Sequence, residues 1–218
     1  MAVSRQQTES ASSIERGPRA RTRRLMLETA TRLMQSGATP SISEVAEAAE
    51  VSRATAYRYF PSQAALVHAV VDEALGPILD WHSDSPDART RVSELLATAM
   101  PRIDEFEATF KAALKLSLDQ WALRQAGTLG NEPQFTRGHR VDLLREATAP
   151  LAGTLSLQSR ERLTQALSLA FGVEVLIVLK DIWGLTADRA QAVTQWAATA
   201  LVDAAIRDTQ HERSLLSQ

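Results

Sequence analysis

Residues 40–62, PSISEVAEAAEVSRATAYRYFPS, contain two short helical segments separated by a tight turn. Ser41 and Glu44 have the spacing of a capping box, and the apolar residues that follow them keep the period of a short helix. Ser52 is placed to cap a second short helix, which Pro61 ends. Because two such helices bury too little apolar surface alone, they need a preceding and a following helix to form a core. The stretch therefore predicts a helix-turn-helix unit.

The second helix carries an unusual concentration of hydrogen-bonding side chains. Both tyrosines of the chain and two arginines lie within residues 51–60. If Val51, Ala56 and Phe60 face inward, the polar and aromatic side chains face outward. Such a face suits the major groove of DNA, where guanidinium groups pair with guanine edges and hydroxyls reach bases or phosphates. The same side chains could instead cover a local core and solvated surface, and their chemistry alone does not distinguish the two. The outward residues are Arg53, Ala54, Thr55, Tyr57, Arg58 and Tyr59.

The segments before this unit complete it. Apolar residues between Met26 and Met34 form a helical stripe, which predicts a helix over 21–36 that Gly37 ends. Residues 1–20 are polar and arginine-bearing and predict a disordered basic arm. Residues 1–60 carry nine arginines and six acidic residues, a net charge of +3, whereas the remainder carries 15 basic and 20 acidic residues, a net charge of −5. A polyanion is therefore expected to meet the N-terminal part, where the arginines of residues 16–24 either reach phosphates or a minor groove or remain solvated.

Residues 45–66, VAEAAEVSRATAYRYFPSQAAL, resemble the signature IA..AGVS..TLYYHF.SKE.L of the TetR family of bacterial transcriptional regulators. The resemblance implies a three-helix DNA-binding domain over 21–66 and an effector-binding and dimerisation domain over 67–218. By the family pattern, bases are read at Arg53, Ala54 and Tyr57, the DNA backbone is gripped at the other outward positions, and the first short helix presents a serine to DNA. The predicted DNA-binding residues are Ser43, Ser52, Arg53, Ala54, Thr55, Tyr57, Arg58 and Tyr59.

Two residues depart from the family pattern. Glu50 stands in the turn where the family usually places glycine. Because a non-glycine residue with positive φ is strained, the turn is either αR-like here or stores a free-energy cost. Gln63 replaces a common lysine, which removes a cationic phosphate contact and lowers the salt dependence of DNA binding by about one counterion.

Helical periodicity continues after this unit and strand alternation is not sustained, so we expect an all-α chain of about nine helices. The expected later helices cover residues 63–79, 88–102, 105–121, 136–149, 160–183 and 187–208, with Pro101 and Asp104 marking a break and 124–134 forming a loop.

Several aromatic residues fall in the middle region, which in the family holds an effector cavity. Aromatic residues at helical spacing are also typical of a plain core, so both interpretations stay open. His82 and His139 either line a cavity or lie at the surface, and Glu174, inside an apolar run, either pairs with an arginine or faces the floor of a pocket. The candidate residues for a small apolar or aromatic effector are Trp81, Phe106, Phe110, Trp121, His139 and Glu174.

The last two expected helices are apolar on more than one side and must be covered on more than one side. Two such helices from each subunit can form a four-helix bundle in a homodimer, which the resemblance also implies. The alternative is a monomeric core that packs them against residues 88–102 or 136–149.

Nothing in the sequence indicates catalysis, a cofactor or a metal site. The four histidines show no HxxxH or HExxH spacing, Gly127 and Gly130 do not form a phosphate loop, and there is no cysteine. The N-terminus has no apolar segment, and the most apolar stretch, 167–179, is interrupted, so we expect a cytoplasmic protein without membrane contact. The sequence predicts a homodimeric repressor released from a palindromic operator in double-stranded DNA by a small ligand. The alternative is a DNA-bound adaptor that responds to a protein partner.

Overall fold

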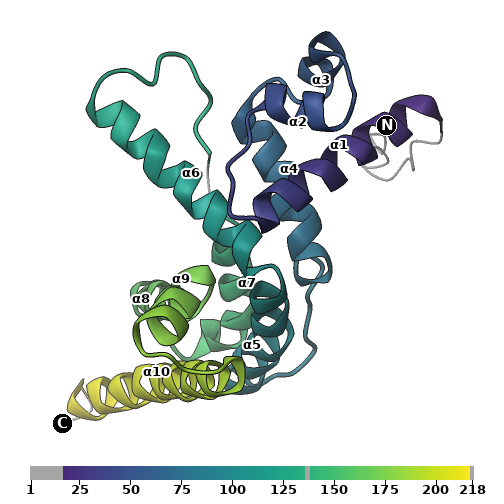
Figure 1. Cartoon of the computed structure of the whole chain (residues 1–218). Helices are drawn as coiled ribbons and strands as arrows, with labels where there is room; N and C mark the ends of the chain where they lie inside the picture. The colour runs from purple at the N-terminus through teal and green to yellow at the C-terminus, as the bar shows by residue number, and fades with distance from the viewer. Residues whose placement is uncertain (1–16, 136–137, 217–218) are drawn as a thin grey trace, which may run out of the picture.

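The computed structural model describes residues 17–135 and 138–216 of the 218-residue chain, with side chains through residue 210. Within these ranges the chain forms helices and turns and no strand, which confirms the all-α prediction (Figure 1). The α-helices are α1 (Pro18–Gln35), α2 (Ile42–Ala48), α3 (Arg53–Tyr59), α4 (Gln63–Leu75), α5 (Ala88–Glu105), α6 (Glu107–Gln125), α7 (His139–Ala147), α8 (Leu157–Leu167), α9 (Val173–Leu176) and α10 (Ala187–Leu216). Between them lie the 3-10 turns η1 (Gly76–Ile78), η2 (Ala149–Gly153) and η3 (Ser168–Ala170) and the π-helical segment η4 (Ile177–Ile182).

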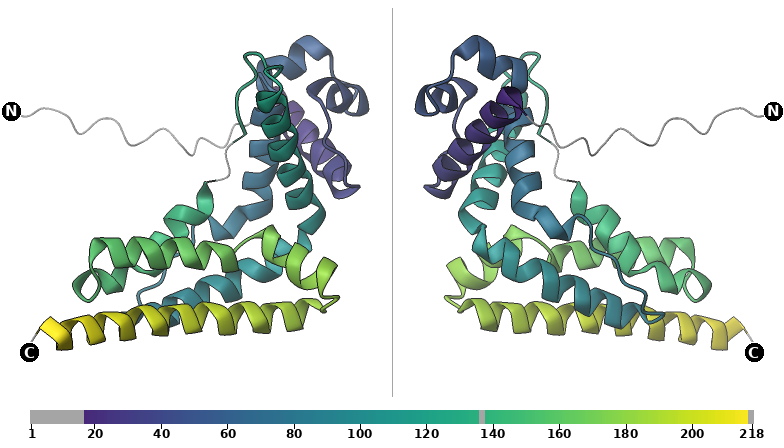
Figure 2. Two further views of the ribbon diagram at one scale, coloured as in Figure 1. Left: turned by 90° about the vertical axis from the view of Figure 1, so that its left-hand side faces the viewer. Right: turned by 90° about the vertical axis from the view of Figure 1, so that its right-hand side faces the viewer.

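The chain has a small N-terminal part above a larger helical base. Helices α1, α2 and α3 with the first turn of α4, here called the head, lie at the top, and α10 runs along the bottom beneath α5 (Figure 2). Helices α4 and α6 connect the two levels, and α6 packs against both α1 and α4. One hydrophobic core runs through head and base, and the fully buried Leu66, Val67 and Val70 of α4 belong to it.

The first helix begins earlier than the sequence predicted. Pro18 occupies its first turn, where the missing N–H of proline leaves no bond unmade. Residues 18–20 are therefore helical rather than part of an arm, while residues 1–16 lie outside the described residues. Met26, Ala30 and Met34 are fully buried, as the predicted stripe requires.

The capping signals of the two short helices are confirmed. Ser41 Oγ accepts a hydrogen bond from the Glu44 amide at 3.2 Å, and Glu44 Oε2 accepts one from the Ser41 amide at 2.7 Å. Ser52 Oγ accepts from the Thr55 amide at 3.2 Å and caps α3. These local bonds fix where both helices begin.

The break expected at Pro101 is wrong, because α5 continues through Pro101 to Glu105. Proline removes one backbone donor, and the buried Met100 and Ile103 keep the helix packed around it. The break comes instead at Phe106, after which α6 runs to Gln125, beyond the expected end at Trp121.

The single helix expected over 160–183 is also wrong. Its two parts, Leu157–Ala170 and Val173–Ile182, are bent by 51°. Gly172 lies between them with a φ of 113°, and a Cβ atom there would lie 2.7 Å from Arg140 Nη2. The bend therefore depends on a glycine that lets a side chain of α7 approach closely.

Among the described residues, no single helix is long and apolar enough to cross a membrane. The two helical parts on either side of Gly172 are long and apolar enough to span a membrane only when they are taken together. Their Leu163, Leu167 and Leu176 belong to the hydrophobic core.

Candidate functional site

Helix α3 presents most of its side chains to solvent. Ala56 is its one buried residue, and Phe60, directly after the helix, is also buried. Arg53, Ala54, Tyr57 and Arg58 are exposed, while Thr55 and Tyr59 are half-buried and the Tyr59 ring packs partly against the core. Tyr57 exposes 49% of its surface. The structure thus brings the predicted recognition residues onto one open face.

Two of the predicted residues also serve the start of α3. Ser52 Oγ donates a hydrogen bond to Thr55 Oγ1 at 3.0 Å in addition to its capping contact. Ser43 lies half-buried in the first turn of α2, next to the capping Ser41. These serine and threonine hydroxyls have further bonding capacity, because each hydroxyl oxygen carries two lone pairs.

Stacked arginines hold the aromatic residues around α3. The Arg58 guanidinium lies 5.5 Å from the centre of the Tyr59 ring, and that of Arg23, on α1, lies 5.6 Å from the Phe60 ring. Arg24 forms an exposed ion pair with Glu28 at 3.3 Å. Of the arginines of residues 16–24, Arg23 therefore packs on Phe60 and Arg24 pairs with Glu28.

The turn between α2 and α3 is strained. Glu50 has a φ of 54°, and among the described residues it is the only non-glycine residue with positive φ. Its amide donates to the Glu47 carbonyl at 3.1 Å, and the Val51 amide donates to the Ala46 carbonyl at 2.8 Å. Of the two alternatives for this turn, the structure has the one that stores a free-energy cost.

Gln63 has a structural role that the sequence did not reveal. Its Nε2 donates to the carbonyls of Thr39 and Pro40, both at 3.0 Å. These bonds connect the start of α4 to the loop between α1 and α2. The missing lysine is thus replaced by a residue that fixes the head internally.

A cavity of about 70 Å³ lies below the head, between α4, α5, α6, α7 and the bend at Gly172. Its surface is mostly apolar, and of the predicted effector residues Phe110 and His139 line it. The lining residues are His68, Val71, Leu75, Ile103, Phe110, Ala113, Phe135, Gly138, His139, Arg140, Leu143, Phe171, Gly172 and Val173.

The other four effector candidates do not line this cavity. Trp121 lies on the outer face of α6 and is 56% exposed. Phe106 marks the α5–α6 junction, where the Arg102 guanidinium lies 4.7 Å from its ring, and Trp81 packs partly against the core after η1. Glu174 pairs with Arg140, Oε2 to Nη2 at 2.8 Å, which confirms the alternative of an arginine partner. Helical spacing put these residues in the right region but did not determine which way each side chain points.

His68 and Arg140 are cavity residues that the sequence analysis missed. The His68 ring lies 4.4 Å from the Phe135 ring, and His68 also lines an open groove between α1 and α4. Burial lowers the pKa of His68, the Asp72 carboxylate opposes this effect, and His139 adds to it. His139 Nε2 lies 2.9 Å from Asp72 Oδ1. The sequence does not show that such polar residues line a cavity, because the residues that they contact there lie on other helices.

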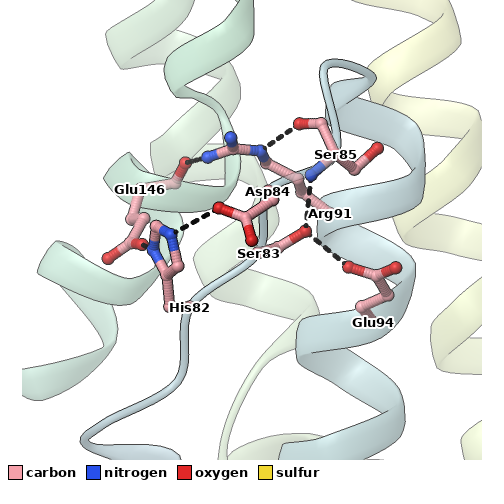
Figure 3. A network of polar contacts seen from close by, with 7 residues as sticks. All are labelled: His82, Ser83, Asp84, Ser85, Arg91, Glu94 and Glu146. Atoms are coloured by element: carbon pink, nitrogen blue, oxygen red, sulfur yellow. Dashed lines mark hydrogen bonds and ion pairs between the residues drawn. The ribbon is translucent and has the colours of Figure 1, made fainter.

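The end of α4 is tied to the base. Arg102 Nη2 donates to the Glu73 carbonyl at 3.2 Å, and Gly76, with a φ of 44°, leaves room for this guanidinium. A polar network follows in the linker to α5 (Figure 3). There His82 Nδ1 lies 2.5 Å from Glu146 Oε1 and its Nε2 lies 3.1 Å from Asp84 Oδ1. The hydrogen bond with Glu146 raises the pKa of His82, which is exposed and lines no part of the cavity.

The described residues contain no group of three or more His, Asp or Glu side chains that could hold a metal ion.

Two capped short helices joined by a tight turn, packed on a longer α1 and a base of helices, define a helix-turn-helix regulator. Residues 26–70 match the sequence model of the family described as "Bacterial regulatory proteins, tetR family". The helix-turn-helix part of this chain is therefore similar to that of the TetR family of transcriptional regulators.

Relatives agree with this assignment to different extents. A segment of 58 residues is 40% identical to the HTH-type transcriptional repressor LfrR of Mycolicibacterium smegmatis. This segment is 27% of the present chain and 31% of that protein. The match thus spans about a third of the relative's length. A TetR transcriptional regulator from Rhodococcus sp. RHA1 aligns with a TM-score of 0.54 and 21% identity over 84% of this chain and 96% of its own. A TetR-family structure from Mesorhizobium loti aligns with a TM-score of 0.51 and 19% identity over 88% of this chain and 98% of its own. These two structures share the fold.

Proposed function

We propose that this protein is a homodimeric, DNA-binding transcriptional repressor that a small molecule releases from a palindromic operator. The observation that carries the proposal is the open face of α3, where two arginines and a tyrosine point away from a buried core. One relative, 40% identical over 58 residues, is a transcriptional repressor, which supports the sign of regulation.

In this proposal α3 enters the major groove of double-stranded DNA. Arg53, Ala54 and Tyr57 contact base edges, because their side chains are exposed on one face of the helix. Thr55, Arg58 and Tyr59, with Ser43 and Ser52 at the two helix starts, contact the phosphates and fix the register. Residues 21–66 then form the DNA-binding domain and residues 67–218 the effector-binding and dimerisation domain.

Dimerisation through the last helices is supported by their exposed apolar side chains. Leu169 after α8, Ile182 and Trp183 in and after η4, and Trp196 on α10 are each at least 72% exposed. Isolated chains rarely leave this many large apolar side chains in water, so the surface fits a partner of the same kind. A two-fold dimer would hold two α3 helices about 34–36 Å apart, the spacing of successive major grooves.

The cavity supports release by a ligand. Its volume of about 70 Å³ is far below the roughly 300–1,000 Å³ of typical ligand sites, so an effector must move its walls. His68, Val71 and Leu75 of α4 form one wall, and α4 also carries the base of the head. A ligand that prefers the expanded state therefore shifts the population toward a changed spacing of the two α3 helices.

One observation favours the alternative of a DNA-bound adaptor for a protein partner. Leu118, Trp121 and Leu123 expose 57%, 56% and 44% of their surface on α6, next to the head. A partner that covers this face would act without entering the cavity. Either form would work in the cytoplasm, where the chromosome of a bacterium lies.

The experiment is a DNA-binding titration with the sequence upstream of the protein's own coding region. Fluorescence anisotropy should give sequence-specific binding that Arg53→Ala with Tyr57→Ala removes, while Arg145→Ala, an exposed arginine on α7, leaves it intact. Specific binding that persists in the double variant would refute the proposed interface. A compound screen for release then separates ligand response from the adaptor alternative.

A further inference from the structure

Arg140 is the charged side chain of the cavity wall, and its contacts come from the bend at Gly172. Its Nη2 donates to Glu174 Oε2 at 2.8 Å and Oε1 at 3.0 Å, and its Nη1 donates to the Ser168 carbonyl at 3.3 Å. Among the described lining residues there is no aspartate or glutamate. The nearest carboxylates, Glu174 and Asp72, are already paired with the lining residues Arg140 and His139. A cationic group in this cavity would therefore meet a guanidinium and no carboxylate of the lining itself.

The two partners of this ion pair differ in their access to water. The side chain of Glu174 is 40% exposed and that of Arg140 is 21% exposed. Glu174 is therefore the better solvated partner, whereas Arg140 needs a replacement for the negative charge it loses when the pair opens. A carboxylate that arrives from the cavity side can supply this charge with the same paired geometry that arginine forms with carboxylates.

The remaining walls set the shape of the molecule that carries the carboxylate. Phe110, Phe135 and Phe171 provide aromatic surface. An apolar cavity of about 150 Å³ is known to hold benzene, so a cavity of about 70 Å³ must roughly double in volume before it admits one ring.

We propose that the effector is a compact monocarboxylate with an apolar body of about one ring, and that its carboxylate replaces Glu174 on Arg140. This inference rests on the proposed effector site and deepens it by naming the ligand class. It also gives the bend at Gly172 a role, since the exchange frees Glu174 and loosens the contact between α7 and α9.

The test measures binding of three probes of one shape to the full chain without DNA. Benzoate, benzamide and benzylamine are titrated by calorimetry at equal ionic strength. The proposal expects benzoate to bind at least about tenfold more tightly than benzylamine, with benzamide between them, because a charge-assisted bond is roughly twice as strong as a neutral one. Equal affinities, tighter binding of benzylamine, or no benzoate binding would overturn it.

Variants locate the carboxylate. Glu174→Gln removes the competing charge and should tighten benzoate binding by about tenfold without a similar gain for benzamide. Glu161→Gln removes the same kind of contact from the exposed Arg145–Glu161 pair, which also links α7 to α8, and should change nothing. An unchanged benzoate affinity in Glu174→Gln would refute the exchange.

A second variant covers the case in which Glu174→Gln fails to fold. Arg140→Gln with Glu174→Gln removes both charges together, so that neither is left without its partner, and should abolish the preference for benzoate over benzamide. A preference that survives in the double variant would contradict the proposal. These titrations contain no DNA, so they test the ligand class separately from operator release. If benzoate binds as expected but does not release the operator, the proposed ligand-induced release fails and the proposed ligand class stands.

Discussion

The strained turn at Glu50 gives a prediction that isolates a backbone effect. Replacing Glu50 by glycine removes a Cβ atom from a residue with a φ of 54° and should stabilise the fold. The Glu50 side chain is exposed, and the hydrogen bond from the backbone amide of residue 50 to the Glu47 carbonyl remains in the variant. The expected gain therefore comes from the backbone conformation.

The magnitude follows from two opposing terms. A left-handed conformation costs a non-glycine residue about 1–2 kcal/mol, and glycine loses about 0.5–1 kcal/mol more than alanine through its greater freedom in the unfolded chain. The free energy of unfolding of Glu50→Gly should therefore rise by about 0.5–1 kcal/mol, which for a chain of this length corresponds to a melting temperature higher by about 2 °C.

Urea unfolding followed by circular dichroism measures this difference. Glu50→Ala keeps the Cβ atom and should gain almost nothing, while Glu50→Asn should lie between, because asparagine tolerates this conformation. Glu47→Gly is the matched control, since Glu47 is exposed within α2 and glycine there should lower stability by about 1 kcal/mol. If Glu50→Ala stabilised the protein as much as Glu50→Gly, charge rather than backbone strain would be the cause.

Three further changes test other contacts. Gln63→Ala breaks two hydrogen bonds to backbone carbonyls and should lower the free energy of unfolding by about 1–2 kcal/mol in urea titrations; an unchanged value would show that these bonds contribute nothing net. His82 has a raised pKa in the folded state, so its stabilisation is fully present below its unfolded pKa and is lost as pH rises through the folded pKa. His82→Ala should therefore lower the melting temperature at about pH 5.5 more than at about pH 9, and an equal loss at both would contradict this. If the last helices form the proposed dimer interface, Trp196→Glu should give monomers in light scattering, and a dimer that persists in this variant would exclude this part of α10 from the interface.

Local signals in the sequence were sufficient for the head. The capping residues Ser41, Glu44 and Ser52 act on atoms three positions away, so their spacing alone predicts the helix starts that the structure contains. The sequence also identified Glu50 as a conflict but could not decide its conformation, because that depends on how α2 and α3 pack against each other.

The base was less predictable because its decisive contacts are distant in sequence. Pro101 reads as a break, yet buried neighbours hold α5 through it. Gly172 lies in an apolar run that suits one helix, and the bend depends on Arg140, more than 30 positions earlier. His68 and Arg140 line the cavity because α4 and α7 pack beside it, and this packing has no local signal in the sequence.

Hydroxyl-radical footprinting of the operator tests the central claim most directly, since that claim is that two α3 helices of a dimer enter successive major grooves. The account predicts two protected segments about one helical turn apart, related by two-fold symmetry, and both lost together in the variant with Arg53→Ala and Tyr57→Ala. A single protected segment, or a footprint unchanged in that variant, would contradict it.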